Sequence, residues 1–426
     1  MNASINTSAV NTNAGFAVLD RMLRKRLLEV VGQLRGGRLD IHDPLGQVRL
    51  GDGGSEKVIR LDIDDARFYR AVAMNGSVGA GESYMEGAWR CDDLVGLIQL
   101  LVRNRDLLDD METGLARVGG VVMRGIHAAR TNTRVGARRN IAAHYDLGNE
   151  FFRLFLSEDM MYSSALWAQA DDTLEAASAR KLERIAEKLE LGPEDHVIEI
   201  GTGWGGFALH AAGRYGCRVT TTTISREQYE LAKSRVEAAG LQDKVDVLLS
   251  DYRDLRGSYD KLVSIEMIEA IGHAQQREYF GQISKLLKPA GRALIQAITI
   301  EDHRYKQALE SVDFIKRYVF PGCFIPSINS MLEAKARSSD LALVHLEDFG
   351  SSYAKTLQSW RERFMQRLDE VRAQGYDERL IRMWEFYLAY CEGGFRERSI
   401  GVAQLLFAKP DCRDADYLPG LRSIEA

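Results

Sequence analysis

Residues 197–212 read VIEIGTGWGGFALHAA, in which a short apolar run breaks into glycines and then resumes with helical spacing. A strand, a glycine loop and a helix in this order bring backbone N–H groups and the positive end of the helix dipole to one point, which suits an anionic ligand. Gly201, Gly203 and Gly206 match the dinucleotide pattern G-x-G-x-x-G. The pattern alone does not distinguish a nicotinamide cofactor from another nucleotide-like ligand.

Strand and helix patterns alternate around this loop. A helical ladder at 173–191 leads into the opening strand at 196–200. The elements that follow are expected to be strands at 217–224, 245–251, 259–266 and 293–300, with helices at 226–240 and 276–291. This alternation predicts a Rossmann-like, doubly wound α/β sheet of parallel strands, with the ligand at the carboxyl ends of the strands.

The second predicted strand separates the candidate cofactors. A dinucleotide fold places an acid about 20 residues beyond the glycines to hold the ribose. Here the strand ends in TTTTIS at 220–225 and has no carboxylate. Glu199 and the turn LKPAG at 287–291 are instead usual in class I S-adenosylmethionine methyltransferases. The sequence therefore favours S-adenosylmethionine over NAD.

The composition indicates a soluble globular protein, because 45% of the 426 residues are hydrophobic and 27% are charged. No apolar segment approaches the ~18 residues of a membrane span. Five cysteines without C-x-x-C spacing favour neither a disulfide framework nor a zinc site. No metal is therefore expected, and a reducing cytoplasm fits best. The net charge of −5 argues against bulk nucleic-acid binding.

The chain is expected to divide into four parts. They are a disordered tail at 1–15, a small, mainly helical domain with a short β element at 16–112, an arginine-rich linker at 113–140, and the α/β domain at 141–426 with a helical insertion at about 302–372. The linker contains no acid. It could bind the phosphates of an anionic lipid surface at about 1 kcal/mol per basic group, or be a solvated linker. Both interpretations stay open.

Short motifs over nearly the whole chain resemble those of cyclopropane-fatty-acyl-phospholipid synthases, and they occur in the family's order. They read GESYMEGAW (81–89), AAHYDLGNEFF (142–152), MMYSSALW (160–167), IEIGTGWGG (198–206), TISREQ (223–228), SDYRDL (250–255), IEMIEAIG (265–272), FIKRYVFPG (314–322) and CEGGFRERSI (391–400). The mycolic acid cyclopropane synthases share the catalytic part.

The resemblance implies methyl transfer to a carbon–carbon double bond. The acceptor in that family is a cis alkene in an unsaturated phospholipid acyl chain, which attacks the sulfonium methyl of S-adenosylmethionine. The resulting carbocation must be shielded from water and then deprotonated to close a cyclopropane ring. An apolar tunnel, aromatic faces and one placed base would meet these needs.

Cofactor-binding residues carry over from the resemblance position by position. The glycine loop is expected to approach the methionine part of the cofactor, because glycines permit close backbone contact. Gln228 resembles the family's ribose contact. The full set implied is Tyr162, Ser163, Gly201, Gly203, Gly205, Thr223, Ile224, Gln228, Asp251 and Tyr252, with the last two at the adenine.

Members of the family hold a bicarbonate ion as the base, between a Cys, a Glu, a His, an Ile backbone and a Tyr. The positions that this implies here are Ser164, Glu269, Gln296, Ile298 and Tyr353. Ser164 and Gln296 depart from the family's Cys and His, and Ala270 replaces the His that follows this Glu in many members. A hydroxyl and an amide can still hydrogen-bond an anion. Whether bicarbonate or water is the base stays open.

The insertion after the strand at 293–300 is expected to cover the acyl tunnel. Its aromatic residues indicate a packed core first, and the candidates for tunnel walls are Phe314, Tyr318, Phe320, Tyr353 and Trp360. The resemblance also implies that the N-terminal domain presents the lipid and aids contacts of a homodimer. The enzyme is then cytoplasmic, bound peripherally to the inner membrane face.

Two alternatives to cyclopropane synthesis stay open. One is a related methyltransferase that leaves a methyl or methylene branch without closing a ring, as in precursors of furan fatty acids. The departures at Ser164 and Gln296 favour this alternative. The other is an inactive lipid-binding protein, against which the intact cofactor motifs stand.

Overall fold

The computed structural model describes residues 18–52, 58–107 and 147–413. Contacts divide the chain into two compact units, Met1–Val122 with Asp377–Phe386, and Met123–Tyr376 with Tyr387–Ala426. The tail, the arginine-rich linker and the predicted boundaries at 15, 112 and 140 lie outside the described residues. Those assignments therefore stay predictions.

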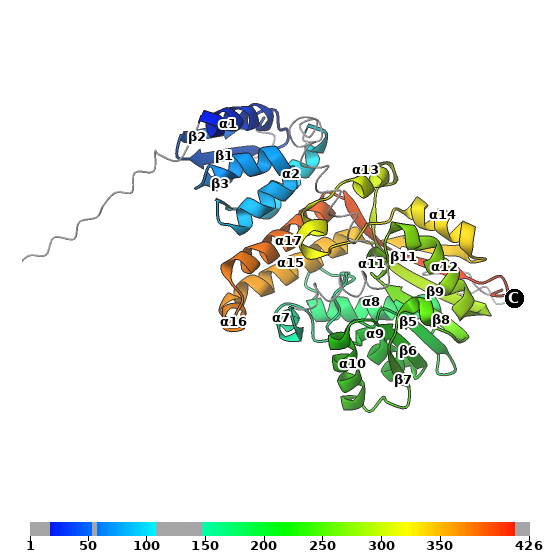
Figure 1. The fold of residues 1–426 in the computed structure, drawn as a ribbon. Coiled ribbons are helices and arrows are strands. Elements are labelled where there is room, and N and C mark those ends of the chain that lie inside the picture. The colour runs from blue at the N-terminus through cyan, green and yellow to red at the C-terminus, as the bar shows by residue number, and fades with distance from the viewer. Residues whose placement is uncertain (1–17, 53–57, 108–146, 414–426) are drawn as a thin grey trace, which may run out of the picture. The chain divides into compact units, whose positions relative to one another are not determined.

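The N-terminal part of the first unit has helices around a four-stranded sheet of order β2-β1-β3-β4 (Figure 1). The elements are α1 (Val18–Val31), β1 (Arg38–Asp43), β2 (Gly46–Leu50), β3 (Val58–Ile63), α2 (Arg67–Met85), β4 (Trp89–Cys91) and α3 (Leu94–Arg103). The sequence predicted only a short β element here. The individual strands could not be predicted because they are short and their outward residues are charged.

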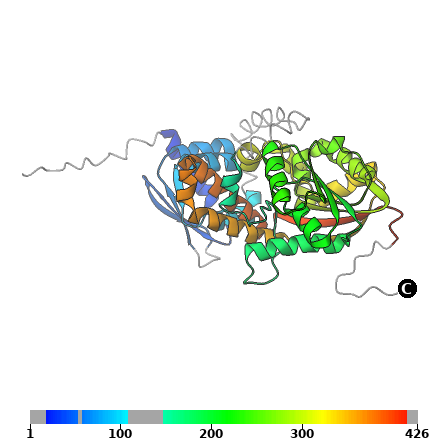
Figure 2. The same ribbon diagram turned by 90° about the horizontal axis from the view of Figure 1, so that it is seen from below.

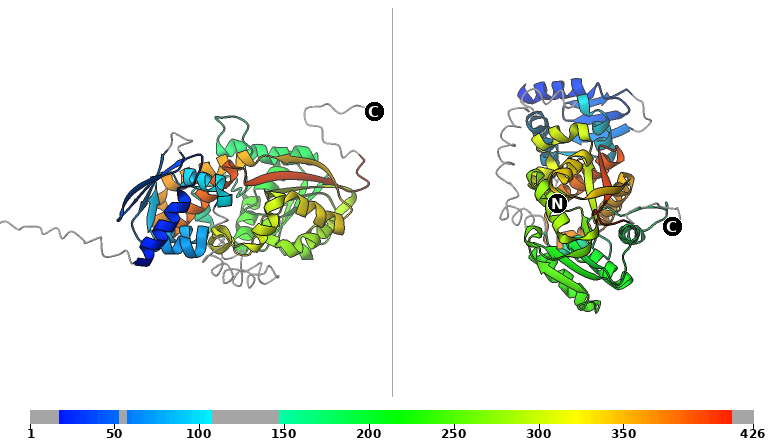
Figure 3. Two further views of the ribbon diagram at one scale, coloured as in Figure 1. Left: turned by 90° about the horizontal axis from the view of Figure 1, so that it is seen from above. Right: turned by 90° about the vertical axis from the view of Figure 1, so that its right-hand side faces the viewer.

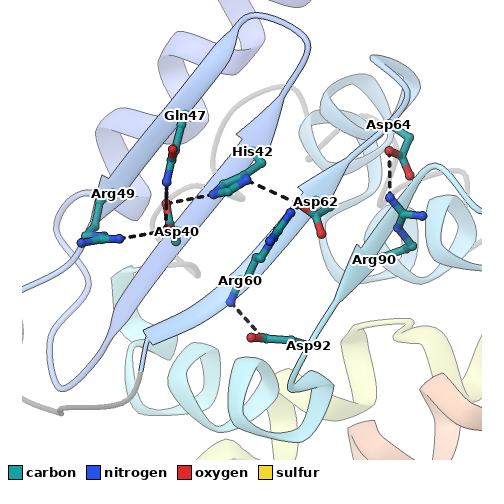
Figure 4. Close-up of polar contacts among 9 residues, drawn as sticks. All are labelled: Asp40, His42, Gln47, Arg49, Arg60, Asp62, Asp64, Arg90 and Asp92. Atoms are coloured by element: carbon teal, nitrogen blue, oxygen red, sulfur yellow. Dashed lines mark hydrogen bonds and ion pairs between the residues drawn. The ribbon is translucent and has the colours of Figure 1, made fainter.

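One face of this small sheet is charged (Figure 4). Asp40 on β1 accepts hydrogen bonds from Gln47 at 2.9 Å and from Arg49 at 3.0 Å. The ring of His42 lies between Asp40 and Asp62, with nitrogen–oxygen distances of 3.4 and 3.7 Å. Leu39 and Ile41 alternate with these residues and are buried. The sheet therefore has one apolar face and one polar face, as the period of two requires.

The second unit is built on a seven-stranded sheet of order β10-β11-β9-β8-β5-β6-β7. Its strands are β5 (His196–Ile200), β6 (Arg218–Thr223), β7 (Val245–Leu249), β8 (Tyr259–Ile265), β9 (Leu287–Ile300), β10 (Ala342–Asp348) and β11 (Ile400–Ala408). The five strands from β9 to β7 pair in parallel, whereas β11 is antiparallel to both β9 and β10. The doubly wound α/β sheet predicted from the sequence is confirmed.

Two hydrophobic cores cover the two faces of this sheet. On β9, Ala293 and Ile295 belong to one core and Leu294 to the other, because successive side chains point to opposite faces. Helices α12 (Gln276–Leu286) and α14 (Ile328–Ser338) cover the first face. The second face is covered by α8 (Leu174–Leu189), α9 (Gly206–His210) and α10 (Arg226–Ala238). Figures 2 and 3 show α8 in teal on one side of red β11, with α12 and α14 on the other.

The segment after β9 carries most of the remaining helices. Around α14 it holds η5 (Asp302–Arg304), α13 (Tyr305–Glu310), η6 (Ile315–Val319), α15 (Gly350–Gln366), α16 (Leu368–Ala373) and α17 (Glu378–Arg396). The sequence predicted a helical insertion at about 302–372, but this range also contains β10, an edge strand of the sheet. Half-buried and exposed residues fill β10, so it lacked the apolar run of a core strand. Short elements elsewhere are α7 (Asn149–Arg153), η2 (Ala211–Tyr215), η3 (Tyr252–Asp254), α11 (Ile268–Ile271) and η4 (His273–Gln275).

Helix α17 contributes to both units. Its residues Asp377–Phe386 group with the first unit, where the hydroxyl of Tyr84 donates to Glu385 at 2.8 Å. The sequence assigned all of 141–426 to the α/β domain and did not anticipate this division. Helical periodicity shows which residues are apolar, not which unit they contact. None of the helices in the described ranges has the length and apolarity that crossing a bilayer requires.

The strand order places a switch point between β5 and β8. From β5 the chain winds outward through β6 and β7, and from β8 it winds the other way through β9. Ligands of open α/β sheets bind where the winding direction reverses, at the carboxyl ends of the strands. The glycine loop follows β5 at this point, and Glu266 directly follows β8.

Candidate active site

The glycine loop has the backbone conformation that glycine favours. The φ angles of Gly201, Gly203 and Gly205 are 103°, 51° and 87°, which side chains with a Cβ rarely adopt. A Cβ on Gly206 would lie 2.6 Å from the sulfur of Met161. A Cβ on Gly203 would meet no described heavy atom within 4 Å. Open space therefore lies next to Gly203, where the sequence predicted the cofactor.

The carboxyl end of β6 positions the predicted ribose contact. The hydroxyl of Thr223 donates to Oε1 of Gln228 at 2.8 Å, and Ser225 caps α10 next to it. Gln228 is buried, while Ile224 is half-buried. The Nε2 group of Gln228 has no hydrogen-bond partner among the described residues. This amide therefore keeps its donors for a ligand.

Asp251 and Tyr252 lie at the carboxyl end of β7. Asp251 accepts two side-chain hydrogen bonds from Arg253, at 2.8 and 2.6 Å, so its orientation is fixed by an ion pair. The hydroxyl of Tyr252 is buried and finds no partner in the described part of the chain, and its burial raises the pKa of the phenol. A buried hydroxyl without a partner is costly, so Tyr252 offers a group that a ligand could satisfy.

Tyr162 and Ser163 follow Met161, whose sulfur lies next to Gly206 of the glycine loop, and Tyr162 packs on Trp360. The hydroxyl groups of Tyr162 and Tyr387 are 2.9 Å apart. Ser163 accepts a hydrogen bond of 2.9 Å from the ammonium group of Lys181 on α8. Lys181 is fully buried, and this burial lowers its pKa from 10.5 to about 8, against the opposing effect of Asp159, Glu266 and Glu199.

Three of the five residues predicted to surround an anion come together, but around a carboxylate of the chain itself. Glu266 accepts three hydrogen bonds, from the backbone N–H of Ser164 at 2.9 Å, from Nε2 of Gln296 at 2.8 Å and from the hydroxyl of Tyr353 at 2.7 Å. Ser164, Gln296 and Tyr353 are buried, and Glu266 is half-buried. Burial raises the pKa of Glu266, and the three donors oppose this rise.

Glu269 follows Glu266 by three residues and lies in the short helix α11. Its Oε1 accepts a hydrogen bond of 2.6 Å from the backbone N–H of Ile298 on β9. Its Oε2 is buried and has no partner among the residues described. Burial, followed by repulsion from Glu266, raises the pKa of Glu269 to about 8. The site thus holds two neighbouring carboxyl groups with different numbers of donors.

A chain of buried polar groups fixes the orientation of Gln296. Its Oε1 accepts from Nε2 of Gln404 at 3.0 Å, and Oε1 of Gln404 accepts from the ammonium group of Lys188 at 2.8 Å. Lys188 also pairs with Glu347 at 2.6 Å. An ammonium group can only donate, so each amide along the chain must present its oxygen toward Lys188. Gln296 therefore presents its N–H to Glu266.

Four residues of this site were not predicted from the sequence, namely Glu266, Lys181, Lys188 and Gln404. Glu266 stands inside the quoted motif IEMIEAIG, directly after an apolar strand at the predicted ligand-binding edge, so its position could have identified it. Lys181 and Lys188 lie on the apolar side of α8, where a charge is unexpected without a partner. No comparable signal marks Gln404, which lies in a strand of apolar residues.

Aromatic rings pack around Tyr353, whose hydroxyl donates to Glu266. Tyr353 packs on Phe395 with ring centroids 4.4 Å apart, and Tyr162 packs on Trp360 at 5.3 Å. The ring centroids of Phe320 and Tyr162 are 6.4 Å apart. Of the other candidate tunnel walls, Phe314 is buried against Tyr318 at 5.3 Å. The faces of such rings attract positive charge, so the surroundings of Glu266 suit a cation.

Comparison with known proteins gives consistent results. Residues 132–405 match the family described as mycolic acid cyclopropane synthetase. The chain is 39% identical to tuberculostearic acid methyltransferase UfaA1 of Mycobacterium tuberculosis, over 79% of each chain. It is 36% identical to the cyclopropane-fatty-acyl-phospholipid synthase of Escherichia coli K12, over 84% of this chain and 89% of the other.

Among solved structures, the chain resembles mycolic acid cyclopropane synthase CmaA1 complexed with SAH and CTAB. The TM-score is 0.60 and the sequence identity 29%, over 64% of this chain and 98% of the other. The fold is thus that of the class I S-adenosylmethionine-dependent methyltransferases, as the sequence predicted. With a family match over more than half of its residues, the chain belongs to the mycolic acid cyclopropane synthetase family.

Proposed function

We propose that this chain transfers the methyl group of S-adenosylmethionine to a cis double bond in an unsaturated phospholipid acyl chain, and that loss of a proton then closes a cyclopropane ring. The observation that carries this proposal is the placement of Glu266 and Glu269 at the switch point, where Glu266 accepts from Tyr353, a member of an aromatic cluster. A methyltransferase that alkylates a heteroatom has no carbocation to stabilise. Aromatic faces together with carboxylates suit this intermediate.

S-adenosylmethionine supplies an electrophilic methyl group on a sulfonium centre. The open space at Gly203 and the Nε2 group of Gln228, which has no partner among the described residues, support its binding beside the glycine loop. The partnerless hydroxyl of Tyr252 offers a third contact. The relative CmaA1, whose structure contains SAH, supports the same assignment.

The reaction follows from what the site offers. The two electrons of the alkene form a bond to the methyl carbon, the sulfonium sulfur leaves with its bonding pair, and a positive charge develops on the neighbouring chain carbon. The rings around Tyr353 and the carboxylate of Glu266 stabilise that charge. Removal of a proton from the new methyl group then releases the electron pair that closes the ring.

A second candidate is methyl transfer without ring closure. The relative UfaA1, at 39% identity, is named a tuberculostearic acid methyltransferase, and its identity exceeds the 36% of the E. coli cyclopropane synthase. Loss of a proton from a neighbouring chain carbon instead of the new methyl would leave a methyl-branched alkene. A hydride shift that moves the charge to the methylated carbon, followed by loss of a methyl proton, would leave an exomethylene branch.

The proposal is tested with the full-length enzyme, S-adenosylmethionine and vesicles of a cis-monounsaturated phospholipid. The expected product gains one CH2 by mass spectrometry and shows high-field cyclopropane protons by NMR. Vinylic or exomethylene signals without cyclopropane signals would support the second candidate. An unchanged lipid, with S-adenosylmethionine still bound in calorimetry, would indicate an inactive lipid-binding protein. Vesicles with anionic and neutral head groups, compared at two salt concentrations, also distinguish the two interpretations of the arginine-rich linker at 113–140, because electrostatic binding to anionic lipid weakens with salt.

A further inference from the structure

This inference rests on the proposed function and concerns the base that removes the proton. The family resemblance implies a bicarbonate ion, and its expected donors were Ser164, Gln296, Tyr353 and the backbone of Ile298. In this chain the first three already donate to the carboxylate of Glu266, and the backbone N–H of Ile298 donates to Glu269. The hydroxyl of Ser164 is also engaged, because it donates to the carbonyl of Ala165 at 2.9 Å.

A second anion at this place would be poorly held. It would have to compete with Glu266 for the same donors, and it would lie beside the carboxyl groups of Glu266 and Glu269. Like charges at a few ångströms in a site of low dielectric repel strongly. The residues present therefore do not fit a bicarbonate ion bound in the expected way.

We propose that the carboxylate of Glu266 is the built-in base of this enzyme and replaces bicarbonate. A carboxylate and a bicarbonate ion have the same planar O–C–O group with delocalised negative charge, so the same donors can hold either. In the reaction, a C–H bond of the new methyl group breaks, the proton passes to an oxygen of Glu266, and the C–H electron pair forms the last bond of the ring. The protonated Glu266 then returns its proton to solvent.

The backbone at Glu266 provides an independent reason to assign it a role. Its φ angle is +49°, a left-handed value that L side chains rarely adopt and that glycine adopts without strain. A residue that gains nothing from its side chain would be glycine at this place. Strained backbone of this kind concentrates at functional sites. The strain therefore points to a requirement for this carboxylate.

The donor sets distinguish the two carboxyl groups. Three donors favour the ionised form of Glu266, whereas Glu269 has one donor and a buried Oε2 without a partner in the described residues. Two adjacent carboxyl groups share their charge unequally when their donors differ. Lys181 is the cation whose charge acts on Glu266. The pair therefore has its negative charge mainly on Glu266, and Glu269 holds the proton.

The first test uses the wild-type enzyme in buffer freed of carbon dioxide. Turnover is expected to be the same with and without added bicarbonate. Loss of turnover in the bicarbonate-free buffer, restored by adding the ion, would overturn the inference while leaving the proposed function intact. No lipid product under either condition would instead contradict the proposed function.

The second test compares Glu266→Gly, Glu266→Gln and the control Glu237→Gln, which changes an exposed glutamate on α10. Loss of a general base typically lowers kcat by about 10²- to 10⁴-fold, and both Glu266 variants are expected to fall in this range. The glycine variant relieves the backbone strain, so it should fold, and bicarbonate or formate should restore its activity by filling the space left by the carboxylate. Glu266→Gln leaves no such space and should not respond.

S-adenosylmethionine affinity, measured by calorimetry, should be unchanged in all three variants. Full activity of Glu266→Gly in bicarbonate-free buffer would overturn the inference. The inference would also be overturned if bicarbonate, formate and acetate all failed to restore the activity of this variant. The loss of activity would then not be due to the missing carboxylate.

Discussion

The side-chain amide of Gln296 lies 2.8 Å from the carboxylate of Glu266 and donates a hydrogen bond to it. This amide cannot turn around, because Gln404 and Lys188 fix its oxygen on the other side. The sequence showed only that a neutral residue stands where the family has a histidine. The structure shows that the buried ammonium group of Lys188 orients this neutral residue, so that it still serves as a donor to an anion.

Gln404→Leu is expected to release this orientation at similar side-chain volume. Gln296 then loses the contact that fixes its oxygen, so its hydrogen bond to Glu266 weakens and the pKa of Glu266 rises. The rate then begins to fall at a higher pH on the acid side of the kcat profile, and kcat decreases about tenfold, as for one lost charge-assisted hydrogen bond. A profile with an unshifted acid limb would show that Gln404 has only a structural role.

Tyr353→Phe removes one donor to Glu266 and keeps the ring contact with Phe395. We expect kcat to fall about tenfold, and the acid limb of the pH profile to move upward again. Binding of S-adenosylmethionine, measured by calorimetry, should not change. A lowered cofactor affinity with normal kcat would place Tyr353 in the cofactor site instead.

Gly203→Val is expected to fill the space that the cofactor needs. A Cβ at Gly203 meets no atom of the described chain within 4 Å, so the loss should come from the ligand and from the positive φ of 51°. Gly240→Val is the matched control, because Gly240 has a φ of 68° and equally open surroundings at the end of α10. Calorimetry should show S-adenosylmethionine affinity reduced at least about tenfold, a difference of about 1.4 kcal/mol, only for the first variant. Equal affinities, or NAD binding to the wild type, would contradict the cofactor assignment.

Lys181→Met should change how stability depends on pH. Burial lowers the pKa of Lys181 from 10.5 to about 8, so between these values the unfolded chain binds more protons than the folded one, and stability rises with pH. The free energy of unfolding of the wild type, relative to that of the variant, should therefore rise by about 3 kcal/mol across this range. Denaturant titrations at several pH values measure this difference. Parallel stability curves would show that folding does not lower the pKa of Lys181.

Much of the sheet could be predicted from the sequence. The run HVIEI and the glycines after it predicted β5 and its loop. Apolar runs between amphipathic helices predicted the strands from β6 to β9. These elements obey local rules. The edge strand β10 and the sheet of the first unit could not be predicted in the same way, since partly exposed strands carry no continuous apolar signal.

Several residues that meet at the candidate site could be predicted from the sequence, but the carboxylate that they contact could not. The resemblance identified Ser164, Gln296 and Tyr353, which do meet, although these residues lie far apart in the sequence. It did not identify Glu266, because the family pattern concerns the donors and an external ion. Which acceptor the donors contact depends on the positive φ that turns Glu266 into the site. Only the folded chain shows that angle.

Isotopic labelling tests the central claim of methyl transfer followed by ring closure most directly. The wild-type enzyme receives S-adenosylmethionine with a trideuterated methyl group and vesicles of a cis-monounsaturated phospholipid, and the lipid product is analysed by mass spectrometry and proton NMR. We expect a cyclopropane product that retains two of the three deuterium atoms, because the proton that leaves comes from the transferred methyl group. A product without cyclopropane protons would contradict ring closure, whether it is a methyl-branched alkene with three deuterium atoms or an exomethylene product with two, and a lipid without deuterium would contradict methyl transfer itself.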